Sequence, residues 1–294
     1  MPKKQKPTPS KHTLYHGVCT EARAPLLYSL AQSNDAEITV ALVADPQRAQ
    51  ELAAELGTYT VWARAKTPLQ TLYFPEDPPP DIDAQRRADR ICDRLTVLSA
   101  LLTSPVGKRL LIATPEALLG ACPDKVAFAQ QRLTLRVGQS YPFSELIATL
   151  TSDLDYDSEA LCEQPGQIAT RGGLIDLYPY DAHEPYRIDF FGDEIESIRR
   201  FDPTTQRTHE EVDEVQIAAA ESADSIHSTE GALLGYLPEG NLQWILDDPT
   251  TLVREHPYRF ENIKTTSANL RSFYQALAHR ENIDTLTSLC ELDT

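Results

Sequence analysis

Two short stretches of the sequence have residue types that could do chemistry. Gly107-Lys108 is similar to the end of a phosphate-binding loop, and residues 209–213 (HEEVD) begin like a helical zinc motif. A phosphate loop needs a glycine five residues before its second glycine and a hydroxyl residue after its lysine, but Leu102 and Arg109 stand there. A zinc site needs three or four placed ligands, and the motif's second histidine is missing. We interpret these stretches as a surface turn and a solvated acidic helix or loop.

No other arrangement of residues indicates an enzyme. The adjacent carboxylates Asp193 and Glu194 stand at a turn between two expected strands, whereas paired acid–base catalysis needs a cleft that separates two pKa values. The sequence has neither a GxSxG nucleophile elbow nor a GxGxxG dinucleotide loop. We therefore expect no catalytic residue, no metal site and no cofactor in this chain.

A hairpin with an unusual outer face is the more informative feature. Gly192-Asp193 is a two-residue turn signal between the expected strands Tyr186–Phe191 and Glu194–Phe201. Because side chains alternate along a strand, Ile188 and Phe190 share the expected core face. A two-residue hairpin would place Phe191 opposite Glu194.

The other face of the first strand holds Arg187, Asp189 and Phe191, and the same register would place Arg187 opposite Ile198. Arginine and aromatic residues are favoured at binding hot spots, although single exposed apolar residues are common. The pattern alone leaves two alternatives open, an interface with another protein and a second buried face. Arg171, before the Gly172-Gly173 pair, could reach the same surface.

Composition limits the class of protein. At roughly 150 residues per domain, 294 residues suggest two domains. The formal net charge of −17 argues against a surface built for nucleic acid, since phosphate binding needs positive charge. No apolar run is long enough to span a bilayer, and the basic, proline-rich start has no signal-peptide pattern. Five scattered cysteines without a CxxC pair are typical of a reduced compartment, so we expect a cytoplasmic protein without a membrane partner.

Strands alternate with helices in the first part of the chain, which predicts an α/β fold with an open parallel sheet. The expected strands are residues 37–44, 58–65 and 110–113. One helix is expected after residue 45, with Gly57 as its C-cap. Two further helices are expected at Ala84–Leu102 and Pro115–Leu119.

Residues 126–215 have mostly strand patterns, which predicts a small α+β domain inserted into the α/β lobe. We place a disordered basic tail at residues 1–14, the first part of the lobe at 15–125 and the inserted domain at 126–215. Residues 216–294 would hold the second part of the lobe and C-terminal helices.

Two long segments carry a family resemblance. ATRGGLIDLYP (169–179) and PYRIDFFGDEIESIRRFDPTTQRT (185–208) resemble the UvrA-binding domain, or UvrB interaction domain, shared by UvrB and the transcription-repair coupling factor Mfd. Residues 93–123 are more weakly similar to the end of the first α/β lobe of the coupling factor. The resemblance covers most of residues 15–250.

The resemblance implies a degenerate RecA-like, P-loop-like α/β lobe with an inserted UvrA-binding domain. UvrB has a phosphate loop near its start, but the comparable residues 15–27 (YHGVCTEARAPLL) lack GK[ST]. This favours the N-terminal module of the coupling factor, without its own nucleotide site. The family's UvrA contacts match Arg171, Arg187 and Phe191 here, and we expect Arg187→Glu or Phe191→Ala to weaken UvrA binding without unfolding the domain.

The expected function is a protein-interaction module of transcription-coupled nucleotide excision repair that recruits UvrA. The family's contacts with RNA polymerase and DNA, and its translocase motor, would belong to parts absent from these residues. The alternative is an ATPase or helicase lobe of a UvrB-like excision repair protein that acts on DNA. A direct nucleic-acid binder is a third possibility, weakened by the net charge.

Overall fold

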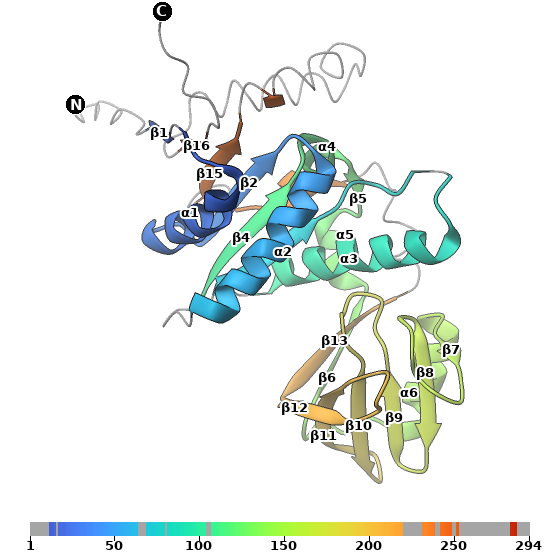
Figure 1. Cartoon of the computed structure of the whole chain (residues 1–294). Coiled ribbons are helices and arrows are strands. Elements are labelled where there is room, and N and C mark those ends of the chain that lie inside the picture. The colour runs from blue at the N-terminus through green and yellow to red at the C-terminus, as the bar shows by residue number, and fades with distance from the viewer. Residues whose placement is uncertain are drawn as a thin grey trace, which may run out of the picture. The chain divides into compact units, whose positions relative to one another are not determined.

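The chain forms two compact units in the computed structural model (Figure 1). The first comprises Met1–Glu76, Ser104–Leu119 and Leu237–Thr294, and the second comprises Asp77–Thr103 and Gly120–Tyr236. Within them, the structure describes residues 12–15, 17–63, 69–79, 81–103, 107–219, 231–238, 242–248, 251–252 and 283–286.

The first unit is built on a parallel sheet, as the alternation of strands and helices predicted. The strands, in spatial order, are β1 (His12–Tyr15), β16 (Ile283–Leu286), β15 (Leu242–Asp247), β2 (Ile38–Val43), β4 (Lys108–Ala113) and β3 (Leu69–Phe74). All neighbouring strands run parallel. The helices of this unit with described bounds are α1 (Thr20–Ser33), α2 (Pro46–Ala63) and α4 (Pro115–Leu119). The α/β class is confirmed.

The sheet owes its stability to continuous apolar burial. Strand β2 reads ITVALV and is buried along its whole length, which is the pattern of a central strand in a parallel sheet. Helices α1 and α2 lie side by side (Figure 1) and share one hydrophobic cluster with the sheet. That cluster includes Leu27, Ala31, Leu52, Leu56 and Ile112.

The sequence interpretation was wrong between residues 57 and 65. We predicted a C-cap at Gly57 and a strand over 58–65, but α2 continues through both to Ala63. The buried residues Leu52 and Leu56 are followed at helical spacing by the half-buried Tyr59. The ring of Tyr59 packs edge-on against Tyr28 at 5.1 Å between centroids. Packing against α1 thus overrides the weak strand preference of TYTVW. Strand β3 was not predicted.

The second unit contains a mostly antiparallel sheet. Its order is β12 (Thr208–Val212), β11 (Glu194–Phe201), β10 (Tyr186–Phe191), β9 (Leu174–Leu177), β8 (Gln167–Arg171) and β7 (Asp157–Ser158); β7 and β8 pair in parallel. Strands β6 (Arg132–Arg136) and β13 (Glu214–Ala218) form a separate antiparallel pair. The helical elements among the described residues of this unit are α3 (Ala84–Leu102), α5 (Lys125–Gln130), α6 (Phe143–Ala148), a π-helical turn (Thr149–Asp153) and α8 (Leu233–Tyr236). Two short strands, β5 (Ala121–Cys122) and β14 (Gly231–Ala232), pair with each other.

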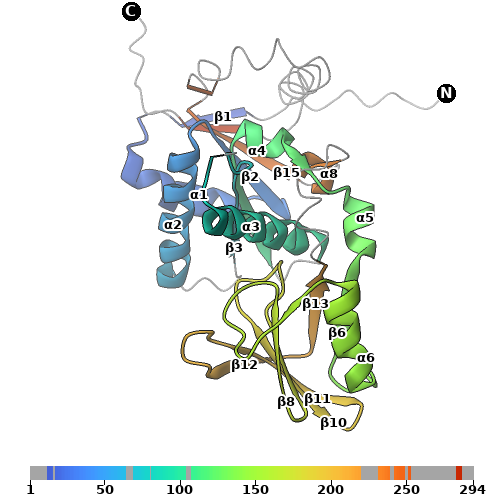
Figure 2. The same cartoon turned by 90° about the vertical axis from the view of Figure 1, so that its right-hand side faces the viewer.

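One face of this sheet forms the core of the second unit. Helix α6 and the pair β6–β13 lie along that face (Figure 2). Each sheet strand from β8 to β11 sends apolar side chains into the cluster. Its buried members include Leu146, Leu150, Ile168, Ile175, Ile188, Ile195, Ile198 and Val215. The opposite face carries a smaller buried cluster of Cys162, Ala169, Tyr178 and Phe201, which covers part of the sheet on that side.

Helix α3 has the bounds that its apolar spacing predicted. The carboxylate of Asp83 caps its first turn by accepting a hydrogen bond from the Arg86 amide, as N-cap residues do. Near its end, Ser99 donates to Asp181 at 2.5 Å, and Arg132 contacts the same carboxylate at 2.7 Å. This buried polar cluster ties α3 to β6 within the second unit.

Residues 1–11 of the predicted tail and the predicted C-terminal helical patterns lie outside the described residues. Residues 12–14, which we predicted to be part of the disordered tail, belong to β1 instead. Among the helices that the structure describes, none combines the length and apolarity that a membrane crossing requires.

Candidate functional site

The hairpin that raised the main question is confirmed in its bounds. Strands β10 and β11 flank Gly192-Asp193, and Gly192 has a φ of +67°, which glycine adopts without steric cost. Phe191 pairs with Glu194, as predicted. The predicted pairing of Arg187 with Ile198 is wrong, because Arg187 lies opposite Arg199. A β-bulge after Asp189 inserts one extra residue into β11 and shifts the register.

Consecutive side chains of β10 lie on opposite faces of the sheet. Ile188 is buried in the core, and the ring of Phe190 packs edge-on against Phe143 at 5.2 Å between centroids. Phe191 points the other way and is 81% exposed. We call the face that carries Phe191 the outer face, and it also holds Arg171, Asp176, Arg187, Asp189 and Arg199.

The strand register brings Arg171 onto this outer face. Arg171 of β8 pairs with Leu174 of β9, and Leu174 pairs in turn with Asp189 of β10. Directly opposite residues of neighbouring strands point to the same side. The three residues singled out from the sequence, Arg171, Arg187 and Phe191, therefore share one face of the sheet.

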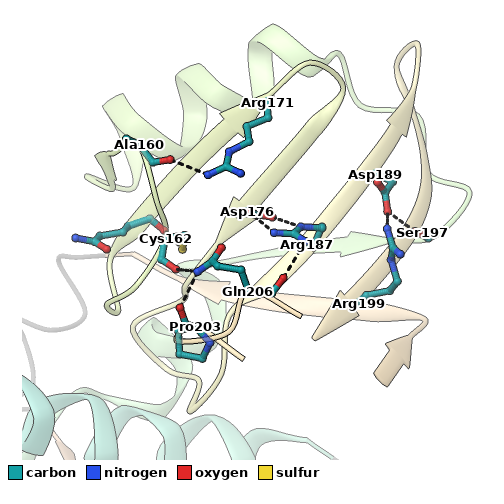
Figure 3. Close-up of polar contacts among 11 residues, drawn as sticks. Ala160, Cys162, Arg171, Asp176, Arg187, Asp189, Ser197, Arg199, Pro203 and Gln206 are labelled. Atoms are coloured by element: carbon teal, nitrogen blue, oxygen red, sulfur yellow. Dashed lines mark hydrogen bonds and ion pairs between the residues drawn. The ribbon is translucent and has the colours of Figure 1, made fainter. Parts of the chain in front are cut away.

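Arg187 is engaged by residues of its own domain (Figure 3). Its Nε and Nη2 donate to the two carboxylate oxygens of Asp176 at 2.7 and 2.8 Å. Its Nη1 donates to the Gln206 carbonyl at 3.3 Å, and the guanidinium lies 4.9 Å from the centroid of the Phe201 ring. The hydrogen bonds to Asp176 raise the pKa of Arg187 above its ordinary value. Arg187 is therefore a charged group that is already neutralised.

A second ion pair lies beside the first on the outer face. The carboxylate of Asp189 accepts hydrogen bonds from Arg199 and from Ser197, the latter at 2.7 Å. Sequence reasoning missed Asp176 and Arg199. The available signal was Asp176 itself, a lone carboxylate inside the apolar run LIDL, because a buried charge requires a partner.

Arg171 is the outer-face arginine whose described contacts include no carboxylate. It is exposed, and its Nη2 donates to the Ala160 carbonyl at 3.2 Å. This carbonyl belongs to the loop between β7 and β8, where Leu161 is also exposed. The outer face thus presents an apolar ring at one position and an available cation at another.

The stretches that resembled catalytic motifs are structural in the described part of the chain. Gly107 has a φ of +115°, but Lys108 is the first residue of β4 and not part of the predicted turn. Its ammonium donates to the carbonyls of Gln32 and Asn34. The predicted acidic helix or loop at His209 is wrong, because His209 lies in strand β12. Its Nε2 is 3.3 Å from Oε2 of Glu184. Among the described residues, no group of three or more His, Cys, Asp or Glu side chains could hold a metal ion.

The sheet with its charged and aromatic outer face belongs to a known class of domain. Residues 133–222 match the UvrB interaction domain, so the chain contains a domain of this class.

The chain is also homologous to transcription-repair-coupling factors. It is 36% identical over 132 residues to the transcription-repair-coupling factor of Escherichia coli (strain K12), a match that covers 45% of this chain and 11% of that protein. It is 38% identical over 128 residues to the factor of Staphylococcus haemolyticus (strain JCSC1435), covering 44% of this chain and 11% of that protein. The chain thus spans about one tenth of the length of the curated relatives that it matches.

Proposed function

We propose that this chain is a protein-binding module of nucleotide excision repair that recruits UvrA and corresponds to the N-terminal part of a transcription-repair-coupling factor. The UvrB interaction domain at residues 133–222 supports the class of partner. The observation that carries the proposal is Phe191, which is 81% exposed on a sheet whose other face is the domain core.

The outer face has the chemistry of a hot spot for protein binding. An aromatic ring that enters a pocket of the partner contributes roughly 2 kcal/mol or more. Arg171 would pair with a carboxylate of UvrA, because an arginine–carboxylate pair is charge-assisted and directional. The chain as a whole is strongly acidic, with a formal net charge of −17, which disfavours association with DNA.

The first unit has the proposed role of a degenerate RecA-like lobe without a nucleotide site. The comparable residues 15–27 lack GK[ST]. In the same segment, Arg23 of α1 forms an ion pair of 2.5 Å with Asp247 at the end of β15, and both side chains are buried. An arginine whose charge is balanced internally is a poor phosphate ligand, so we propose that the chain is not itself an ATPase.

The proposed organisation keeps the domain limits predicted from the sequence, 15–125, 126–215 and 216–294. The second compact unit is larger than the inserted domain defined by these limits, because it also contains helix α3 and extends to Tyr236. In this proposal, RNA polymerase and DNA are contacted by parts of the family outside these residues, and the module acts in the cytoplasm.

A titration of the full 294-residue chain against purified UvrA tests the proposal. We expect saturable binding that Phe191→Ala weakens by at least tenfold. Val126→Ala is a matched control, since Val126 is 61% exposed on α5 of the same unit, and it should bind like the wild type. Absence of binding by a folded wild-type chain would overturn the proposal.

A further inference from the structure

We infer that Asp176 and Arg187 form a positioning pair beneath the UvrA-binding surface, and that the cation offered to the partner is Arg171. The inference rests on the proposed function and deepens it, because it separates the residue that contacts the partner from the residues that arrange the surface.

The first support is the burial of Asp176. Its side chain is 4% exposed and that of Arg187 is 19% exposed. A buried carboxylate is costly unless it is paired and hydrogen-bonded. If Arg187 turned away to bind a carboxylate on another protein, Asp176 would remain buried and uncompensated. Arg187 therefore keeps its bidentate pair when a partner binds.

The second support is that Arg187 is also held by contacts other than its pair with Asp176. Its guanidinium lies over the ring of Phe201 and donates to the carbonyl of Gln206. Gln206 belongs to the turn that follows β11, and its backbone N–H donates to the backbone carbonyl of Asp202 at 2.7 Å. Arg187 thus links β9 and β10 to this turn.

The third support is a continuous set of contacts from this turn to Arg171 (Figure 3). The side-chain amide of Gln206 donates to the carbonyls of Pro203 at 2.7 Å and Cys162 at 3.4 Å. Two residues before Cys162, the Ala160 carbonyl accepts a hydrogen bond from Arg171. The pair of Asp176 and Arg187 therefore orders the loop that orients the Arg171 guanidinium.

Asp176→Asn distinguishes positioning from direct contact, because the two roles predict opposite effects. The substitution keeps the size of the side chain and removes its charge. If Arg187 contacted UvrA directly, its release from Asp176 would leave binding unchanged or strengthen it. If the two residues position the surface, Asp176→Asn should weaken UvrA binding by roughly three- to tenfold, as should Arg187→Ala, and the double variant should be no weaker than either.

The experiment titrates UvrA with the full wild-type chain and with the Asp176→Asn, Arg187→Ala, double and Phe191→Ala variants. Circular dichroism of each variant checks that it is folded. Unchanged or tighter binding by a folded Asp176→Asn variant, with binding lost in Arg187→Ala, would overturn the inference.

A second readout on the free chain separates this inference from the proposed function. Amide NMR spectra should show shifted resonances at residues 159–163 and 202–207 in Arg187→Ala and Asp176→Asn, but not in Phe191→Ala. A wild-type chain that does not bind UvrA would overturn the proposed function. Resonances of both segments that stay in place in the two pair variants would overturn the positioning role, whatever UvrA does.

Discussion

Phe190 and Phe191 are neighbours in the sequence and lie on opposite faces of β10. The half-buried ring of Phe190 contacts Phe143 at the edge of the domain core, whereas Phe191 is 81% exposed. Two residues of the same type therefore have different expected roles, one in folding and one in partner binding.

Truncation of these two residues should separate stability from binding. Phe190→Ala removes contacts of a half-buried ring with the core and should lower the free energy of unfolding by about 2 kcal/mol. Phe191→Ala should change it by less than about 0.5 kcal/mol, as exposed substitutions do, while UvrA binding falls at least tenfold. Urea unfolding of both variants measures the difference. A large loss of stability in Phe191→Ala would show that its side chain supports the fold.

Substitution of Arg187 by glutamate should destabilise the second unit. The sequence alone led us to expect that Arg187→Glu would leave the fold intact, but the structure places Arg187 against the buried carboxylate of Asp176. The new carboxylate would face Asp176, and we expect a loss of roughly 3 kcal/mol. Arg199→Glu, at a more exposed pair with Asp189, is the comparison and should cost less. Equal urea midpoints for Arg187→Glu and the wild type would contradict this.

The cluster around Asp181 gives a prediction for helix α3. Asp181 accepts hydrogen bonds from Ser99, Arg132 and the amide of Ala218. Asp181→Ala leaves the buried Arg132 charge unpaired and should cost about 3 kcal/mol, whereas Ser99→Ala removes one hydrogen bond and should cost about 1 kcal/mol. Urea unfolding followed by far-ultraviolet circular dichroism measures both. A smaller effect for Asp181→Ala than for Ser99→Ala would contradict the expected order.

Addition of ATP should leave the thermal stability of the chain unchanged. A ligand that binds the folded state raises the unfolding temperature by mass action, and the proposed lobe has no phosphate loop. A thermal-shift titration with Mg-ATP and Mg-ADP tests this. A saturable increase would revive the alternative of a UvrB-like ATPase lobe. If that increase vanished in Arg23→Ala, the site would lie near the ion pair between Arg23 and Asp247.

The stability of the chain should fall at alkaline pH. Burial raises the pKa of the Cys122 and Cys162 thiols to about 12, whereas an unfolded cysteine titrates near 8.5. Between these values the folded state binds more protons than the unfolded state, so the free energy of unfolding decreases as pH rises. Below about pH 8 these thiols should have no effect. Urea midpoints at pH 7, 9 and 10 measure the slope, which Cys162→Ala should reduce; an equal slope in that variant would refute the role of Cys162.

The sequence by itself determined the features that depend on local pattern. Alternating apolar residues and a glycine turn predicted the hairpin of β10 and β11 with its bounds, and apolar spacing predicted α3. The same alternation placed Arg187 and Phe191 opposite the core, because side-chain direction in a strand follows from backbone geometry alone. The class of domain could also be predicted from the sequence, since each of the two matching segments is a continuous stretch of the chain.

Tertiary structure decided the features that depend on residues distant in the sequence. Helix α2 extends through residues 58–63 because Tyr59 packs on Tyr28 of another helix. The bulge in β11 changed the partner of Arg187, since register is set by pairing along the whole hairpin. The bidentate pair with Asp176 joins two strands. Whether Arg187 is an available cation or a neutralised one was therefore decided by a neighbour that only the folded sheet brings beside it.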